Sequence, residues 1–415
     1  MAPQGSHTPR DSRDRVGSAN YRRKTQSGLN MRRAFKFRLY PTANQARELG
    51  IMVETHRRLY NAALEQRKLA YETRGLSLNY YAQSNQLKEL RASDPYQART
   101  NFSSEQATLR RLDKAYQNFF RRCQQGSKAP GFPRFKGREH YDSVTFPAYG
   151  DGIRLADNRL RVQHVGTVRT KIHRSVDGTV KTATLKREAD KWFVVLSCDL
   201  GDVVVAPSTL PAGGIDVGLE AFLTTSDGQR IGNPRYQKAE LPKLRRLQRA
   251  TSRKKKGGRN RRKASRRVRV LHARVRNLRH EHHHQVALKL IRLYGLIGVE
   301  SLSVSNMLKN HSLARAISDA GWAGFVNVLR CKAERAGAEV VAVNPRGTSQ
   351  ECSGCGVVVA KTLADRWHTC PDCGLSLHRD ENAARNVLAR ALQARTGPAG
   401  LKSNPALVRE AVCFS

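Results

Sequence analysis

Two Cys-x-x-Cys pairs constrain the fold of this chain more than any other feature of its sequence. Cys352 and Cys355 form the first pair, and Cys370 and Cys373 form the second a short segment later. Four thiolates at this spacing suit one tetrahedral Zn²⁺ ion better than a disulfide or a redox site. We expect a structural zinc, because four Cys ligands leave no position open for water. His368 is an alternative ligand, although a loop histidine without a metal role is the simpler interpretation.

A carboxylate follows the second pair closely. Asp380 opens a proline-free segment with apolar residues at helical spacing, which predicts a helix over 380–395. Alone, Asp380 is equally well explained as the N-cap of that helix. If zinc orders the preceding loop, it also orders the segment that delivers this carboxylate.

Two further acids interrupt apolar strands elsewhere in the chain. Asp216 lies in "GGIDVG" and Glu300 in "LIGVESL". A charged carboxylate in such a strand is costly unless it binds a cation or lies at an exposed strand end. Each acid has an equally good structural explanation by itself. Together, Asp216, Glu300 and Asp380 supply what two Mg²⁺ ions about 4 Å apart need for phosphodiester hydrolysis.

The N-terminal half of the chain predicts a β unit that a helical segment interrupts. "FKFRLY" at 35–40 alternates apolar and basic residues, and short β-rich pieces over 153–206 predict an antiparallel sheet or small barrel. Between them, 44–73 and 80–125 carry apolar residues at helical spacing, with a break at "SDPYQ".

The C-terminal half predicts an α/β unit, because strand and helix patterns alternate there after a linker-like "VVVAPSTLPAGG". The expected elements are a hairpin over 213–231, basic helices at 236–256 and 264–293, a strand at 296–302, a helix at 313–337, a strand at 338–345 and the last helix.

The charge of the chain points to nucleic acid. Lys and Arg number 75 against 34 Asp and Glu, a net charge of +41, and a polyanion is the expected partner of such a protein. The densest stretch, 253–269, has eleven cations and no acid. We favour a surface for the phosphate backbone over a solvated basic helix pair. The predicted contacts are Arg253, Lys254, Lys255, Lys256, Arg259, Arg261, Arg262, Lys263, Arg266, Arg267 and Arg269.

The remaining composition bears on location. The sequence has no apolar run of the length that crosses a membrane. Apart from the two pairs, four cysteines are scattered singly, which is typical of free thiols in a reducing compartment. We therefore expect a cytoplasmic protein that associates with the nucleoid when it binds DNA.

Taken in order, "RAFKFRLYPT", "GIDVGLEAF", "VESL", "DAGWAGF", "TSQECSGCG" and "HRDENAARNV" resemble the TnpB proteins of insertion sequences, relatives of the type V CRISPR effector nucleases. The resemblance implies an RNA-guided, Mg²⁺-dependent DNA endonuclease that holds a guide RNA and cuts double-stranded DNA beside a short motif. Asp216, Glu300 and Asp380 match the catalytic acids of the family. A nuclease-inactive, RNA-guided regulator of transposition is the alternative, and a strand-transferring transposase is less favoured.

The resemblance also implies a multi-domain protein of α/β and β class, with a RuvC-like nuclease fold of RNase H type, a zinc-ribbon insertion and an N-terminal β-barrel that a helical domain interrupts. The expected boundaries are 1–30 for a disordered extension, 31–43 and 126–206 for the β-barrel wedge domain, 44–125 for the helical recognition domain, 213–348 and 376–395 for the RuvC-like domain, 349–375 for the zinc ribbon and 396–415 for a tail.

Three features depart from the family pattern, the first of which is the long extension before Met31. His378 stands where an acid is frequent, and the run "HEHHHQ" has no counterpart. Because the three consecutive residues His282 to His284 cannot share one helix face, we do not expect them to form a metal site.

Overall fold

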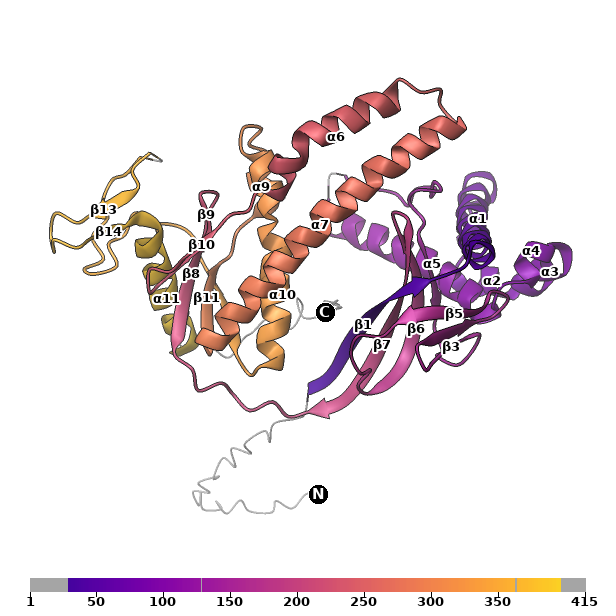
Figure 1. The fold of residues 1–415 in the computed structure, drawn as a ribbon, viewed down its shortest axis with the longest axis horizontal. Coiled ribbons are helices and arrows are strands. Elements are labelled where there is room, and N and C mark those ends of the chain that lie inside the picture. The colour runs from indigo at the N-terminus through magenta and orange to yellow at the C-terminus, as the bar shows by residue number, and fades with distance from the viewer. Residues whose placement is uncertain (1–28, 128, 363, 397–415) are drawn as a thin grey trace, which may run out of the picture.

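A computed structural model describes residues 29–127, 129–362 and 364–396. Within these ranges, a unit of helices and β-strands from the N-terminal half lies beside an α/β unit from the C-terminal half, and a long helix, α7 (Arg259–Leu293), runs between them (Figure 1). The predicted extension and tail fall almost wholly outside the described residues. Among the described helices, none combines the length and apolar character that crossing a membrane requires.

The N-terminal unit is built on a seven-stranded antiparallel sheet in the order β2-β6-β7-β1-β5-β4-β3. The alternation predicted at 35–40 is confirmed, since Phe35, Phe37 and Leu39 are buried against the helices. No strand pairing joins the edge strands β2 and β3 in the described part of the chain, so the hydrogen bonds define an open antiparallel sheet, which is one of the two arrangements predicted from the residues, and not the closed barrel that the resemblance implied. The strands are β1 (Leu29–Tyr40), β2 (Ser143–Phe146), β3 (Ile153–Ala156), β4 (Arg159–Val162), β5 (Gly166–Lys171), β6 (Thr179–Glu188) and β7 (Lys191–Val203).

The helical segment begins and ends at residues suited to helix termini. Thr42 and Gln45 form a capping box at the start of the first helix, and Gly75 ends it with a left-handed backbone. The predicted break at "SDPYQ" is confirmed, because Asp94 caps a short helix that starts with Pro95. The helices are α1 (Ala43–Arg74), α2 (Tyr80–Asn85), α3 (Leu87–Ser93), α4 (Pro95–Ala98) and α5 (Phe102–Gln124).

The α/β unit has a five-stranded mixed sheet in the order β10-β9-β8-β11-β12. The predicted hairpin is confirmed, and a turn at Asp227 and Gly228 extends it to a third strand. The strands are β8 (Ala212–Val217), β9 (Ala221–Thr225), β10 (Arg230–Gly232), β11 (Leu296–Glu300) and β12 (Glu339–Val343), of which β8, β11 and β12 run parallel.

Helices cover both faces of this sheet. Ile297 and Val299 pack toward α7 and α10 on one face, whereas Leu296 packs toward α11 on the other. The alternation follows from the period of two in a strand. The remaining helices are α6 (Tyr236–Ser252), α8 (Val304–Met307), α9 (Ala314–Ala320), α10 (Trp322–Arg335) and α11 (Arg379–Thr396).

Three predicted helices have different limits in the structure, and the first basic helix ends at Ser252 where 256 was predicted. The helix expected over 313–337 is divided at Gly321, whose φ of 67° is left-handed and interrupts regular helix. The second basic helix begins at Arg259, five residues before the predicted start at 264, so that part of the basic stretch is helical.

Candidate nuclease and zinc sites

The first two acids of the predicted site lie at the ends of neighbouring parallel strands. Ile215 pairs with Val299, so Asp216 and Glu300 occupy the next position on each strand. Residues two apart point to the same face of a sheet. Since Gly214 and Gly298 face α11, the side chains of Asp216 and Glu300 are directed to the α11 face as well.

Two glycines let α11 approach this face closely enough to bring in the third acid. A Cβ atom on Gly214 would meet the backbone oxygen of Ala384 at 2.1 Å, and one on Gly298 would meet the Val387 oxygen at 3.0 Å. The helix therefore lies directly on the two strands. Asp380 is in its first turn and only partly exposed, with 16% of its side-chain surface accessible.

The electrostatic environment of Asp216 includes the other two acids. Burial raises the pKa of Asp216 well above its ordinary value, and the negative charges of Glu300 and Asp380 raise it further, against the opposing effect of Arg379. Burial also raises the pKa of Glu300, while a hydrogen bond from Thr348 opposes that rise. Asp216 is the acid whose pKa responds to the charges of both others.

The ligands that the three acids offer are carboxylate oxygens. Among the described residues, the acids do not form a group of three ligands whose donor atoms all lie within 4.8 Å of one another. The donor chemistry suits Mg²⁺, which prefers carboxylate oxygens. The buried hydroxyl of Thr224, opposite Asp216 in the sheet, has no hydrogen-bond partner in the structure and lies on the same face.

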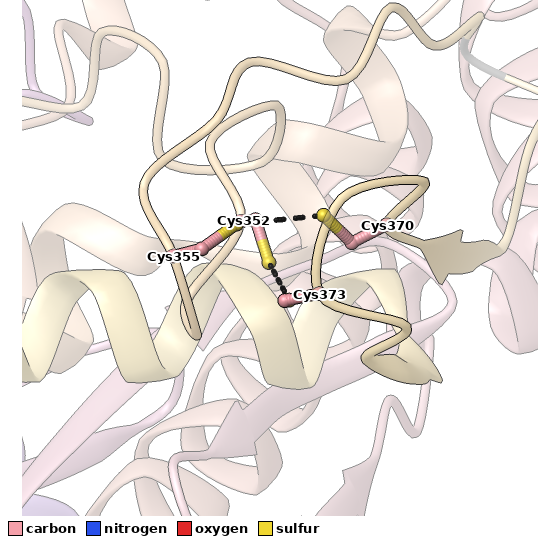
Figure 2. Close-up of side chains that lie close together, drawn as sticks. All are labelled: Cys352, Cys355, Cys370 and Cys373. Carbon is pink, nitrogen blue, oxygen red and sulfur yellow. Dashed lines mark hydrogen bonds between the residues drawn. The ribbon is translucent and has the colours of Figure 1, made fainter.

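The four predicted cysteines meet at one point. The Sγ atoms of Cys352 and Cys373 are 3.6 Å apart and those of Cys355 and Cys370 are 3.5 Å apart, and all four ligand atoms lie within 4.8 Å of one another (Figure 2). This geometry fits a tetrahedral Zn²⁺ site with thiolate ligands. His368 is not among these four ligands; it is buried in the strand Trp367–Thr369, where a loop was predicted, and it contacts Lys361 through Nδ1.

The cysteines outside the two pairs differ in whether they carry a free thiol. Cys123 and Cys198 carry free thiols. Cys331 is in a disulfide, so the prediction of free thiols at all single positions was wrong. Cys413 lies outside the described residues.

One face of α11 connects the cysteine cluster to the acids, and the sequence did not single out the residues that do so. Asn382 accepts a hydrogen bond from the Ser353 N–H at 2.9 Å and donates one to the Glu351 carbonyl at 2.7 Å. One turn later, Asn386 donates to the carbonyls of Thr348 and Glu351 at 2.8 and 2.7 Å.

Thr348 extends this connection to the acidic site. Its hydroxyl donates a hydrogen bond of 2.6 Å to Oε1 of Glu300. Arg390, two turns beyond Asn382 on α11, holds the Asn344 and Arg346 carbonyls at 2.7 Å each. The spacing of Asn382, Asn386 and Arg390 by four residues was the signal in the sequence that could have revealed this face.

The structure divides the predicted nucleic-acid contacts into two groups. Arg266 pairs with Asp190 at 3.2 Å and Arg269 pairs with Glu139, both acids of the N-terminal unit. Arg261 donates to the carbonyls of Thr251 and other residues that end α6. The other eight cations are exposed and make no ion pair with a described residue. They are Arg253, Lys254, Lys255, Lys256, Arg259, Arg262, Lys263 and Arg267.

The histidine run on α7 is divided between two faces, as the helical spacing predicted. His282 packs its ring against Phe222 at 4.9 Å, and His283 is buried with Nε2 2.9 Å from the Ala320 carbonyl. Burial lowers the pKa of His283 to about 4, so it is a neutral core residue at physiological pH. His280 and His284 share the opposite face, with their Nε2 atoms 3.3 Å apart.

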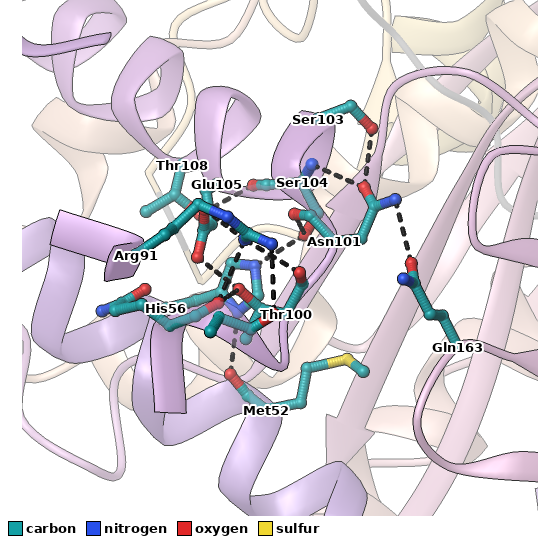
Figure 3. Close-up of polar contacts among 12 residues, drawn as sticks. Met52, His56, Arg91, Thr100, Asn101, Ser103, Ser104, Glu105, Thr108 and Gln163 are labelled. Atoms are coloured by element: carbon teal, nitrogen blue, oxygen red, sulfur yellow. Dashed lines mark hydrogen bonds and ion pairs between the residues drawn. The ribbon is translucent and has the colours of Figure 1, made fainter. Parts of the chain in front are cut away.

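A buried polar network outside both sites joins α5 to its neighbours (Figure 3). His56 on α1 has Nδ1 2.8 Å from the Met52 carbonyl and Nε2 2.8 Å from the Ser104 hydroxyl. Glu105, also fully buried, pairs with Arg91 at 2.9 Å. Every one of these side chains has a partner within the network, which is what a structural role requires.

Comparison with known proteins identifies the family. Residues 198–311 match the family described as "Probable transposase", and residues 322–387 match "Cas12f1-like, TNB domain". A "Putative RNA-guided DNA endonuclease" of Streptomyces pristinaespiralis is 34% identical over 400 residues, which cover 90% of this chain and 96% of the relative. "Putative RNA-guided DNA endonuclease InsQ" of Escherichia coli (strain K12) is 30% identical over 376 residues, or 86% of this chain and 91% of the relative. The chain belongs to the TnpB family.

Other matches add little about this TnpB protein. Residues 31–75 match a "Helix-turn-helix domain", but here they form part of β1 and the single long helix α1. The solved "Structure of the mini-RNA-guided endonuclease CRISPR-Cas_phi3" is 11% identical with a TM-score of 0.46, covering 88% of this chain and 92% of that one. A likeness of that size supports no conclusion about the TnpB site.

Proposed function

We propose that this TnpB protein is an RNA-guided DNA endonuclease that cuts double-stranded DNA beside a short adjacent motif. The observation that carries the proposal is the convergence of Asp216, Glu300 and Asp380 at the ends of two parallel strands and the start of the helix packed on them. The names of the relatives that match most of this chain agree with it.

The chemistry at the acidic site would be metal-assisted hydrolysis. Asp216, which both other acids influence, would hold both ions, while Glu300 and Asp380 would each complete one. Mg²⁺ supplies Lewis-acid stabilisation of the phosphoryl oxygens and activates water for attack on phosphorus. The hydrogen bond from Thr348 keeps one oxygen of Glu300 engaged and so orients the other. The zinc at the four cysteines would be structural and would hold the loop that α11 binds through Asn382.

The rest of the chain would hold nucleic acid. We assign 213–348 and 376–395 to a RuvC-like domain and 349–375 to the zinc ribbon. The N-terminal sheet would be the wedge domain and 44–125 the recognition domain. The exposed cations between Arg253 and Arg267 would contact the phosphates of the guide RNA or the target DNA, and base pairing with the guide would supply sequence specificity.

The test is to purify the protein with its co-purifying RNA, sequence that RNA and incubate the complex with a matching plasmid, with and without Mg²⁺. We expect Mg²⁺-dependent cutting that Asp216→Asn abolishes while RNA content is unchanged. Asp227→Asn is the matched control, because it keeps an acceptor for the Tyr294 hydroxyl and lies outside the acidic site. Cutting by Asp216→Asn at the wild-type rate would contradict the proposal, and RNA and DNA binding without cutting would favour the inactive regulator.

A further inference from the structure

Trp367 is the tryptophan of this protein that is exposed. The chain has three tryptophans, and Trp192 and Trp322 are buried with 6% and 3% of their surfaces accessible. Trp367 has 58% of its surface accessible. A single exposed apolar side chain needs no explanation by itself, so the significance of Trp367 depends on how it is held and on what lies beside it.

The indole ring has a fixed orientation. Trp367 lies on β13 (Trp367–Thr369), which pairs with β14 (Ser376–His378) in a two-stranded hairpin of the cysteine region. Its Nε1–H donates a hydrogen bond of 2.7 Å to the Ser376 hydroxyl. The His378 ring meets the indole at 86° with centroids 6.2 Å apart. These two contacts hold the ring and leave much of its surface exposed.

The same histidine links this ring to the acidic site. His378 is the cross-strand partner of Trp367. Its Nδ1 accepts a hydrogen bond from the Asp380 N–H at 3.2 Å and lies 3.8 Å from Oδ2 of that acid. The indole is therefore separated from a proposed Mg²⁺ ligand by one side chain.

A rigid, exposed indole that is separated from Asp380 by one side chain is better suited to bind a nucleobase than any other part of a DNA strand. Bases stack on aromatic side chains without regard to sequence, because every base has a π face. Arg366 precedes Trp367, but its Nε is paired with Glu220 at 3.5 Å, so the inference rests on the indole face and not on this cation.

We propose that Trp367 is a positioning residue on which one base of the DNA strand stacks while its phosphate lies at the acidic site. The inference rests on the proposed function and adds a residue that fixes the register of the strand relative to Asp380. The side chain takes no part in bond breaking. Its removal therefore weakens binding of the strand more than it slows the chemical step.

The first experiment is independent of cleavage. The Asp216→Asn protein with its co-purified RNA is titrated with single-stranded oligothymidylate in Mg²⁺ while tryptophan emission is recorded. Because the other two tryptophans are buried, stacking should quench only the emission of Trp367. We expect strong quenching in this background and none after the additional change Trp367→Phe. Equal quenching in both proteins, or no quenching in either, would overturn the inference.

The second experiment measures kcat and KM for single-stranded DNA complementary to the RNA. Trp367→Ala should raise KM roughly tenfold, the size expected for one lost base–aromatic stack, with kcat and zinc content unchanged. Trp367→Phe should restore KM because it keeps an aromatic face. A fall in kcat with unchanged KM would refute the positioning role. If no variant cuts DNA, the proposed function fails, while the quenching experiment still decides whether the base stacks.

Discussion

Replacing Asn382 by Ala tests whether α11 holds the cysteine region in place. Asn382 is fully buried and lies two residues after Asp380. Its side chain accepts a hydrogen bond from the Ser353 N–H and donates one to the Glu351 carbonyl. Both bonds are lost in Asn382→Ala.

The free-energy cost of Asn382→Ala depends on whether the former partner of each lost hydrogen bond keeps another partner. The Glu351 carbonyl keeps the hydrogen bond from Asn386 at 2.7 Å, so the loss of its bond from Asn382 costs about 1 kcal/mol. The Ser353 N–H loses its side-chain acceptor next to the cysteine cluster, which costs about 1–3 kcal/mol more. Opening of the 351–353 loop away from α11 should therefore become easier by roughly 2–4 kcal/mol, or about 100-fold at the middle of that range.

The assay is the rate at which a chelating dye removes zinc from the folded protein. Removal by chelator follows the population of the open loop when reclosing is fast. We expect release about 100-fold faster in Asn382→Ala than in the wild type, on the arithmetic above. Arg385→Ala is the matched control on the same helix, because it breaks only the exposed ion pair with Glu381, worth about 0.5 kcal/mol or less. Release from Asn382→Ala at the rate of this control would refute the argument.

Three further predictions concern pH, salt and metal. Burial lowers the pKa of His56 from 6.5 to about 4, so between pH 6.5 and 4 the unfolded chain binds more protons at this residue than the folded protein does. The free energy of unfolding should therefore fall by up to about 3 kcal/mol as the pH drops from above 6.5 to 4. Urea unfolding of the N-terminal unit at pH 7 and 4.5 should show this loss, and His56→Leu should lack it. Arg262→Ala should reduce the slope of log K for nucleic acid against log salt by about 0.7–0.9, whereas Arg266→Ala, whose side chain already pairs with an acid, should reduce it less; equal slopes would contradict the division of the basic stretch. Thr348→Val removes the hydrogen bond to Glu300, so cutting should need a Mg²⁺ concentration about 10- to 100-fold higher. An unchanged Mg²⁺ dependence would show that the bond does not orient Glu300.

Much of the fold was predictable because it depends on local patterns. The alternation around Phe35, the break at "SDPYQ" and the position of Asp216 in an apolar strand are all visible over a few residues. The cysteine cluster was predictable for a different reason, since one ion demands four ligands and the sequence offers two suitable pairs. These features needed no knowledge of distant contacts.

Other features depend on contacts that no local pattern contains. Whether β2 and β3 close a barrel depends on the curvature of the whole sheet. The break at Gly321 depends on α9 and α10 following different directions, which "DAGWAGF" does not reveal. The roles of Asn382 and Thr348 require α11 to lie against the 344–353 segment, and an Asn in a helix is usually a neutral surface residue. Only the spacing of Asn382, Asn386 and Arg390 pointed to a common face.

The basic stretch shows how the three-dimensional structure refines an argument from charge. In the sequence the eleven cations of 253–269 are equivalent, because no acid lies among them. The fold brings acids from the N-terminal sheet unit to α7. There Glu188 forms an ion pair with Arg276 at 2.9 Å, and Asp190 forms one with Arg266 at 3.2 Å. Cations without such partners gather where α6 and α7 join, at the end of the helix pair that projects from the α/β unit (Figure 1). At that end a phosphate does not have to displace a protein carboxylate, so nucleic acid would bind most strongly there. The paired arginines nearer the sheet would hold the two units together.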